Sequence, residues 1–110
     1  MHNLDPVFDA LADGTRRAIL ARLSLGDASV GALSEPFSIS APAISRHLRV
    51  LEGAGLIGHR RVGKQRLCHL NRPRLALAAG WIAELTTETE AQFDRLDAYL
   101  KTLSPNGDPT

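Results

Sequence analysis

Two arginines and a serine, Arg46, Arg49 and Ser45, have the types and the spacing that could read the edges of nucleic-acid bases. They lie in the stretch SAPAISRHLRVL, residues 40–51, which we expect to be a helix because its apolar residues recur at steps of three and four. The apolar face consists of Ile44, Leu48 and Leu51. The serine and the arginines project from the opposite face, and a guanidinium can donate two hydrogen bonds to guanine in the DNA major groove.

The residues at the start of this helix have small side chains, which would let the helix approach another surface closely. Ser40 is expected to be the N-cap, since its hydroxyl can accept from a free backbone N–H of the first turn, and Pro42 falls where no N–H is needed. Either Gly53 or Gly55 is expected to end the helix. The alternative is an ordinary surface helix whose charged face is only solvated, so the neighbouring segments must decide between the two interpretations.

Charge is distributed unevenly along the chain, although its net value is only +1. Residues 40–74, which we call the basic centre, hold eight Lys and Arg against the single acid Glu52. The segments before and after it, residues 1–39 and 75–110, are both net acidic. Such a concentration of positive charge is typical of a surface that binds a polyanion, most often nucleic acid.

Three short helices are predicted before the basic centre. The second covers about residues 15–23 and is expected to carry its arginines, including Arg16, largely on its outer side. The third is capped by Ser29 and should be ended early by Pro36. Only residues 38–40 separate this third helix from the arginine-bearing helix, so the two form a helix-turn-helix unit.

Residues 56–61 and 65–70 predict two short strands joined by a turn at residues 62–64. The cations around this turn are Arg60, Arg61, Lys64 and Arg66. A basic hairpin placed directly after a helix-turn-helix is a wing, and we favour phosphate contact for its cations. The alternative is an edge hairpin that charge keeps soluble.

From Leu75 to residue 103, apolar or small residues keep steps of three and four, which predicts a long amphipathic helix with coiled-coil-like spacing. Threonines between residues 86 and 89 weaken its middle, so the pattern leaves open a kink or a division into two helices. This helix has more apolar face than the helix-turn-helix can cover, and a dimer would bury the excess. Residues 104–110 are expected to be a disordered tail.

The composition, with 44% hydrophobic and 23% charged residues in 110, is typical of one globular domain, expected here over residues 1–103. No signal peptide or membrane-spanning run is recognisable, so no membrane partner is expected. A single cysteine, Cys68, fits a reducing compartment, and we expect the cytoplasm. The sequence has no nucleophile elbow, phosphate loop or paired-carboxylate motif, so neither an enzyme nor a cofactor is expected.

Three stretches resemble, in this order, the ArsR/SmtB family of bacterial winged-helix repressors: ALADGTRRAIL at 10–20, SAPAISRHLRVLEGAGLI at 40–57, and the basic hairpin ending at Asn71. The fold that the resemblance implies agrees with the pattern of elements. It is mainly α with a small β-hairpin: four helices, two strands and a long C-terminal dimerisation helix, in a winged helix-turn-helix.

The resemblance also implies an assembly and a partner. The expected protein is a homodimer formed through residues 5–12 and 73–103. Each subunit would place its arginine-bearing helix in one major groove of a palindromic operator in double-stranded DNA, with the wing over neighbouring backbone or minor groove. Members of this family are repressors, so repression is the expected outcome.

The expected contacts fall into two groups. Those with DNA are Ser40, Ala41, Pro42, Ser45, Arg46, His47, Arg49, Arg60, Arg61, Lys64 and Arg66. Those in the dimer interface are Phe8, Leu11, Trp81, Leu85, Phe93, Leu96 and Leu100. Because His47 borders the apolar stripe, packing or orientation of a phosphate is favoured for it over metal ligation.

The metal ligands of the metal-sensing family members are missing here. The third helix reads SVGALSEPF without cysteine, and the last helix has acids but no histidine, so no metal site is carried over and metal-independent regulation is expected. His59, Cys68 and His69 could approach one another, depending on strand register, but would make a poor cage. A redox role for Cys68 and an organic effector are left open.

The alternative function comes from another class of protein: a winged-helix module whose basic centre binds an acidic protein.

Overall fold

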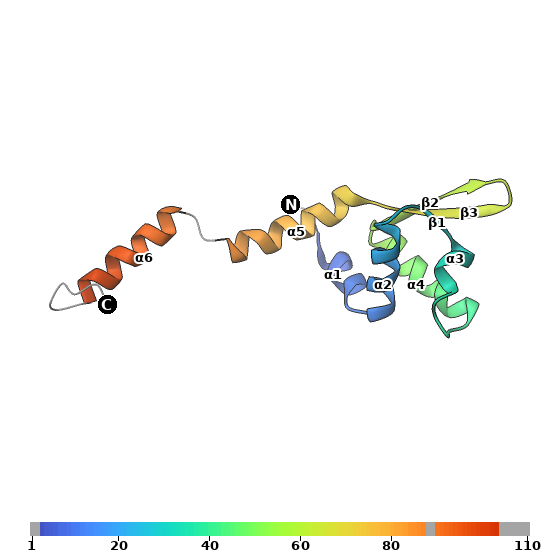
Figure 1. Cartoon of the computed structure of the whole chain (residues 1–110), viewed down its shortest axis with the longest axis horizontal. Helices are drawn as coiled ribbons and strands as arrows, with labels where there is room; N and C mark the ends of the chain where they lie inside the picture. Colours follow the sequence, from blue (N-terminus) through green and yellow to red (C-terminus); the bar gives the residue numbers. More distant parts are fainter. Residues whose placement is uncertain (1–2, 88–89, 104–110) are drawn as a thin grey trace. The chain divides into compact units, whose positions relative to one another are not determined.

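The computed structural model describes residues 3–87 and 90–103. The chain divides into two compact units, of which the first ends at Gly80 and the second begins at Trp81. The elements of the first unit are α1 (Asp5–Leu11), α2 (Gly14–Leu23), β1 (Ala28–Ser29), α3 (Val30–Ser34), α4 (Ala41–Gly53), β2 (Ile57–Val62), β3 (Gln65–Leu70) and the beginning of α5 (Arg72–Thr86). The second unit holds the end of α5 and α6 (Glu90–Leu103). The predicted class, mainly α with a small antiparallel sheet in a winged helix-turn-helix, is confirmed (Figure 1).

Side-chain caps begin four of the described helices, α2 to α5, and in α5 the Asn71 Oδ1 accepts from Arg74 N at 3.4 Å. The Asp13 carboxylate accepts from the backbone N–H of Arg16 at the start of α2, at 3.0 Å. The hydroxyl of Ser29 accepts from Ala32 N (3.1 Å) in α3, and that of Ser40 from Ala43 N (3.3 Å) in α4. The predicted caps of α3 and α4 are therefore confirmed, and each satisfies a backbone donor that the helix itself leaves free.

The end of α4 is set by Gly55, which has φ +76°. Its N–H donates to Glu52 O at 2.9 Å, and the N–H of Leu56 donates to Leu51 O at 3.0 Å. This pair of bonds is a Schellman motif, and its left-handed residue explains why glycine occupies position 55. Of the two glycines that the sequence offered as helix stops, Gly53 is the last residue of the helix itself.

The sheet has three strands in the order β1-β3-β2, all pairings antiparallel. The β2–β3 hairpin, which is the wing, pairs Val62 with Gln65, so its turn is the two residues Gly63 and Lys64 rather than three. Gly63 has φ +62°, as the first residue of a tight type II′ hairpin turn requires. The third strand, β1, was not predicted, because two residues are too few to show an alternating pattern.

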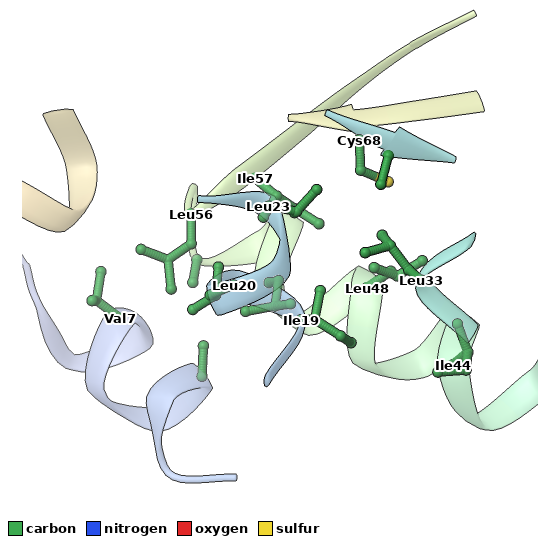
Figure 2. Packing of buried hydrophobic residues seen from close by; sticks show 14 of the residues in the cluster. Val7, Ile19, Leu20, Leu23, Leu33, Ile44, Leu48, Leu56, Ile57 and Cys68 are labelled. Atoms are coloured by element: carbon green, nitrogen blue, oxygen red, sulfur yellow. The ribbon is translucent and has the colours of Figure 1, made fainter. Parts of the chain in front are cut away.

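One hydrophobic cluster holds the first unit together and receives side chains from α1 to α4 and, through Ala78, from α5 (Figure 2). Its largest completely buried members are Ile19, Leu23, Leu33, Ile44, Leu51, Leu56, Val7 and Cys68. Phe8 and Leu11 of α1 are partly buried against the same cluster. Each large apolar side chain taken out of water here contributes about 1.5–3 kcal/mol, so this cluster is what gives α4 its fixed orientation.

Where the sequence predicts one long final helix and leaves its continuity open, the structure has two helices. α5 ends at Thr86, whose hydroxyl donates to the Ile82 carbonyl at 3.1 Å, and α6 begins at Glu90. Threonine is β-branched and its hydroxyl competes for backbone carbonyls, which weakens a helix at this point. The expected tail at residues 104–110 lies outside the described residues. None of the described helices is both long and apolar enough to cross a lipid bilayer.

Candidate nucleic-acid interface

α4 has a buried face and an exposed face. Ile44, Leu48 and Leu51 are between 0% and 7% exposed and pack in the core cluster. Position 44, one turn into the helix, and position 51, two turns further, lie on one side because the helix repeats every 3.6 residues. The helix therefore cannot rotate without taking this stripe out of the core, and its opposite face is held outward.

The outward face of α4 carries most of the predicted DNA contacts of this helix. Ser40, Ala41, Pro42, Arg46 and Arg49 are exposed, and Ser45 is half-buried. Within the described part of the chain, neither Arg46 nor Arg49 makes a hydrogen bond or an ion pair through its side chain. Two guanidinium groups beside small residues form a surface that can enter a groove and donate hydrogen bonds.

His47 lies between the two faces and contacts α2. The Nη1 of Arg16 donates toward His47 Nδ1 at 3.4 Å, and the Asp13 carboxylate lies 3.7 Å from the same nitrogen. Both partners stand at the start of α2, so these contacts join the N-terminal helices to α4. The location fits packing, one of the two roles that we favoured for this histidine over metal ligation.

Sequence reasoning missed the structural part played by Arg16, which is half-buried rather than free on the outer side of α2. Its Nε donates to Ala10 O at 2.7 Å and its Nη2 donates to Asp9 O at 3.0 Å, which satisfies carbonyls at the end of α1. The Arg16 backbone N–H is the main reason why the pKa of Asp13 is lowered, since it stabilises the carboxylate. In the sequence, the only sign of this structural role is that Arg16 follows the capping Asp13 by three residues.

The wing presents its cations in two ways. Arg60 lies 3.4 Å from the Asp27 carboxylate, and Arg66 lies 3.9 Å from that of Glu52. Arg61 and Lys64 are exposed, and no described residue was found to pair with either of them. Of the four wing cations expected to contact phosphate, the structure pairs Arg60 and Arg66 with acids and leaves the two at the tip, Arg61 and Lys64, exposed.

A shallow groove of about 390 Å³ lies between the beginning of α3 and the wing. Lys64 and Arg66 line it from the wing, and Ser29, Val30 and Gly31 line it from the other side. Two cations beside a groove can accept an anionic group such as a phosphate. The groove therefore places two cations of the wing beside the first helix of the helix-turn-helix.

Strand register separates the three potential metal ligands of the wing, His59, Cys68 and His69. His59 is opposite Cys68, whereas His69 is opposite Gly58, so His69 points to the other face of the sheet. Burial raises the pKa of the Cys68 thiol, and the nearby Glu52 carboxylate adds to the effect. Over residues 3–87 and 90–103, no group of three His, Cys, Asp or Glu side chains is arranged to hold a metal ion.

The residues predicted for dimerisation differ in exposure. Phe8 and Leu11 are half-buried against the core of the first unit. The predicted residues of α5 and α6 are exposed: Trp81, Leu85, Phe93, Leu96 and Leu100. Large apolar side chains in this number are uncommon on the surface of a protein that acts as a monomer.

A helix fixed by its apolar face, with unpaired arginines outward and a basic hairpin following it, defines a winged helix-turn-helix protein that binds DNA. Residues 11–60 match a family model described as a helix-turn-helix domain. The chain belongs to the ArsR/SmtB family of winged helix-turn-helix transcriptional regulators, which is not a family of enzymes.

Two curated relatives and two solved structures illustrate the similarity. The HTH-type transcriptional regulator Rv2034 of Mycobacterium tuberculosis is 38% identical over 96% of this chain and 94% of its own length. The transcriptional repressor SdpR of Bacillus subtilis is 39% identical over 72% of this chain and 88% of its own.

Among solved structures, the crystal structure of the ArsR family transcriptional regulator RHA00566 is similar with a TM-score of 0.72 and 38% identity, over 76% of this chain and 91% of its own. The solution structure of a homodimeric winged helix-turn-helix domain, Mb0332 from Mycobacterium bovis, has a TM-score of 0.60 and 25% identity, over 74% of this chain and 81% of its own.

Proposed function

We propose that this chain is a cytoplasmic, homodimeric repressor that binds a palindromic operator and does so without a metal ion. In each subunit α4 enters one major groove with Ser45, Arg46 and Arg49, while Ser40, Ala41 and Pro42 allow close approach. The cations of the wing, led by Arg61 and Lys64, contact the DNA backbone.

The observation that carries this proposal is the fixed orientation of α4. Its apolar stripe is buried in the core cluster, and Arg46 and Arg49 on the opposite face are exposed. An arginine directed at a groove discriminates between bases, whereas the cations of a hairpin tip reach phosphates more easily. The two elements therefore supply specificity and general affinity.

The dimer is supported by the apolar residues of the second unit. Phe93, Leu96 and Leu100 of α6 are each about half exposed or more. Their spacing places them on one helix face, as a coiled-coil-like contact requires. The homodimeric domain from Mycobacterium bovis is a structural neighbour of this chain. We propose residues 5–12 and 73–103 as the dimerisation region, within one functional domain that covers residues 1–103.

Repression and metal independence rest on separate observations. One of the relatives, that of Bacillus subtilis, is named a transcriptional repressor. The described α3 has no cysteine, and α5 and α6 have no histidine in their sequences, so the ligands that zinc prefers are missing from these helices.

Footprinting of the full chain on the DNA upstream of its own coding sequence tests the proposal. We expect protection of two half-sites one helical turn apart, centred on a two-fold axis. Equal binding to operator and random DNA at every salt concentration would contradict sequence-specific binding. Capture of an acidic protein by the wild type, with no DNA binding, would favour a protein-docking module instead.

A metal titration tests the regulatory part of the proposal. Zinc, cadmium or arsenite added to a preformed complex should leave the protein on DNA. A Cys68→Ser variant controls for nonspecific loss through oxidation or crosslinking of the thiol. Stoichiometric release at low micromolar metal, in the wild type and in this variant, would show that a metal site exists.

A further inference from the structure

Glu52 stands out because it is the only acid among residues 40–74. It lies near the end of α4 and is half-buried. A carboxylate within a surface that binds a polyanion repels that polyanion, so its presence needs a structural reason. The contacts of Glu52 supply one.

The Glu52 carboxylate joins α4 to both strands of the wing. Nδ1 of His59, in β2, donates to its Oε1 at 2.5 Å. Nη2 of Arg66, in β3, lies 3.9 Å from the same oxygen and donates toward His59 Nε2 at 3.4 Å. The three side chains thus form one charged, hydrogen-bonded group with a member on each of three elements.

Strand register explains why this group matters for the wing. Arg61 is directly opposite Arg66, so two like charges share one face of a narrow hairpin. Like charges in this position destabilise a strand pair. The pairing of Arg66 with Glu52 offsets that repulsion, and it leaves Arg61 as the unpaired cation of the two.

Asp27 acts from the other face of the hairpin. Arg60 alternates with Arg61 along β2, so its side chain leaves the sheet on the opposite face, where it lies 3.4 Å from the Asp27 carboxylate. Two acids of the body of the first unit therefore contact the wing, one on each face. The cations left for a ligand are those nearer the tip, Arg61 and Lys64.

We propose that Glu52 is a positioning residue that holds the wing against α4, through His59 and Arg66, so that the wing tip and the outward face of α4 meet DNA together. This inference rests on the proposed function for its DNA readout. It reassigns Arg66 from DNA contact to attachment of the wing, and it adds Glu52 and His59 to the residues on which operator binding depends.

The direction in which DNA affinity changes when Glu52 is replaced distinguishes a positioning role from electrostatic repulsion of DNA. Removal of a negative charge near DNA should by itself tighten binding to every sequence and steepen the salt dependence. Loss of a positioning contact should weaken binding to the operator, because the wing and α4 are then no longer held in the bound geometry before association.

The test compares Glu52→Ala with Glu35→Ala in the full chain. Glu35 follows α3, is exposed, and has no ion pair with a described residue, so its replacement removes the same charge without touching the wing. We expect Glu52→Ala to lower operator affinity about two- to fivefold, the size typical of a partly exposed ion pair. Glu35→Ala should leave operator affinity unchanged or slightly increase it. An equal or greater operator affinity for Glu52→Ala would overturn the proposal.

A second readout needs no DNA. Amide hydrogen exchange in the hairpin, residues 57–70, should be faster in Glu52→Ala than in the wild type and in Glu35→Ala, with α2 unchanged. Unchanged exchange in the hairpin would overturn the proposal even if the wild type bound no DNA. If alanine lowers the melting temperature of the whole chain, Glu52→Gln replaces it, because this variant keeps the size of the side chain and removes only the charge.

Discussion

Two amphipathic helices of this chain, α4 and α6, carry similar apolar spacing and have different surroundings. The stripe of α4 is buried, with Leu51 fully so, in the core of the first unit. The corresponding residues of α6 stay exposed, with Phe93 at 58% and Leu96 at 49%. A period of 3.6 residues predicts that a helix has an apolar face, but it does not say which chain provides the covering surface.

The comparison suggests two kinds of failure on mutation. Damage to the α4 stripe should disrupt the fold of one subunit, since its partners lie within the same unit. Damage to the α6 face should leave the subunit folded and remove the proposed contact with a second copy. Both should lower DNA binding, so stability and assembly must be measured separately to tell them apart.

The largest effect is expected from Leu96→Arg. An arginine in the proposed contact buries an unpaired charge, so the dimer should dissociate. A monomer keeps only one half-site, and loss of the second reduces operator affinity by about 10²- to 10⁴-fold. Sedimentation equilibrium measures the assembly, and a mobility-shift titration measures the affinity.

A control for this variant is Ala98→Arg, which adds the same charge on the opposite side of α6. It should remain dimeric and bind the operator at least as well as the wild type. A wild-type protein that sediments as a strict monomer at micromolar concentration would remove the basis of the comparison.

The next largest effect is expected from Leu51→Ala. This side chain is completely buried, so its truncation should lower the free energy of unfolding by about 2–5 kcal/mol. Urea denaturation followed by circular dichroism measures the loss. In the background of Leu96→Arg the same loss is expected, because distant sites act additively. A much smaller loss in that background would mean that the packing of α4 depends on the dimer.

Smaller effects are expected from Arg49→Ala in α4 and Lys64→Ala in the wing, and they should separate base recognition from phosphate contact. Arg49→Ala should reduce discrimination between operator and random DNA by roughly 1–3 kcal/mol, since base contacts carry specificity. Lys64→Ala should lower both affinities alike and reduce the salt slope by about one unit. Titrations across a salt series measure both quantities. Loss of specificity at Lys64 with none at Arg49 would mean that the wing reads the sequence.

The smallest effect concerns the Asp13 carboxylate, which caps α2 and also lies near His47 of α4. The lowered pKa of Asp13 means that folding favours its carboxylate, so the stability it contributes is present above its ordinary value of 3.8 and is lost as pH falls through the lowered value. Asp13→Asn keeps a helix cap but does not titrate. The difference in unfolding free energy between wild type and variant should be constant at neutral pH and shrink below about pH 4. Parallel pH profiles in urea denaturation would contradict this.

Local rules in the sequence determined most of the elements of the first unit. Ser29 and Ser40 cap their helices as expected, because an N-cap needs only its own hydroxyl and a backbone N–H three residues on. The apolar stripe of α4 was predicted from periodicity, and the wing from two short strands around Gly63. These features depend on residues close together in the chain, which is why the sequence alone was sufficient for them.

Contacts between distant residues were decided only by the tertiary structure. Arg16 reaches the end of α1 and also His47, 31 positions further along the chain. Glu52 meets Arg66 only because the Schellman turn at Gly55 and the register of the hairpin bring the wing back to α4. The number of wing cations could be read from the sequence, but which of them are paired depends on the strand register. Register depends on pairing across the whole sheet, and a short run of charged residues carries no information about it.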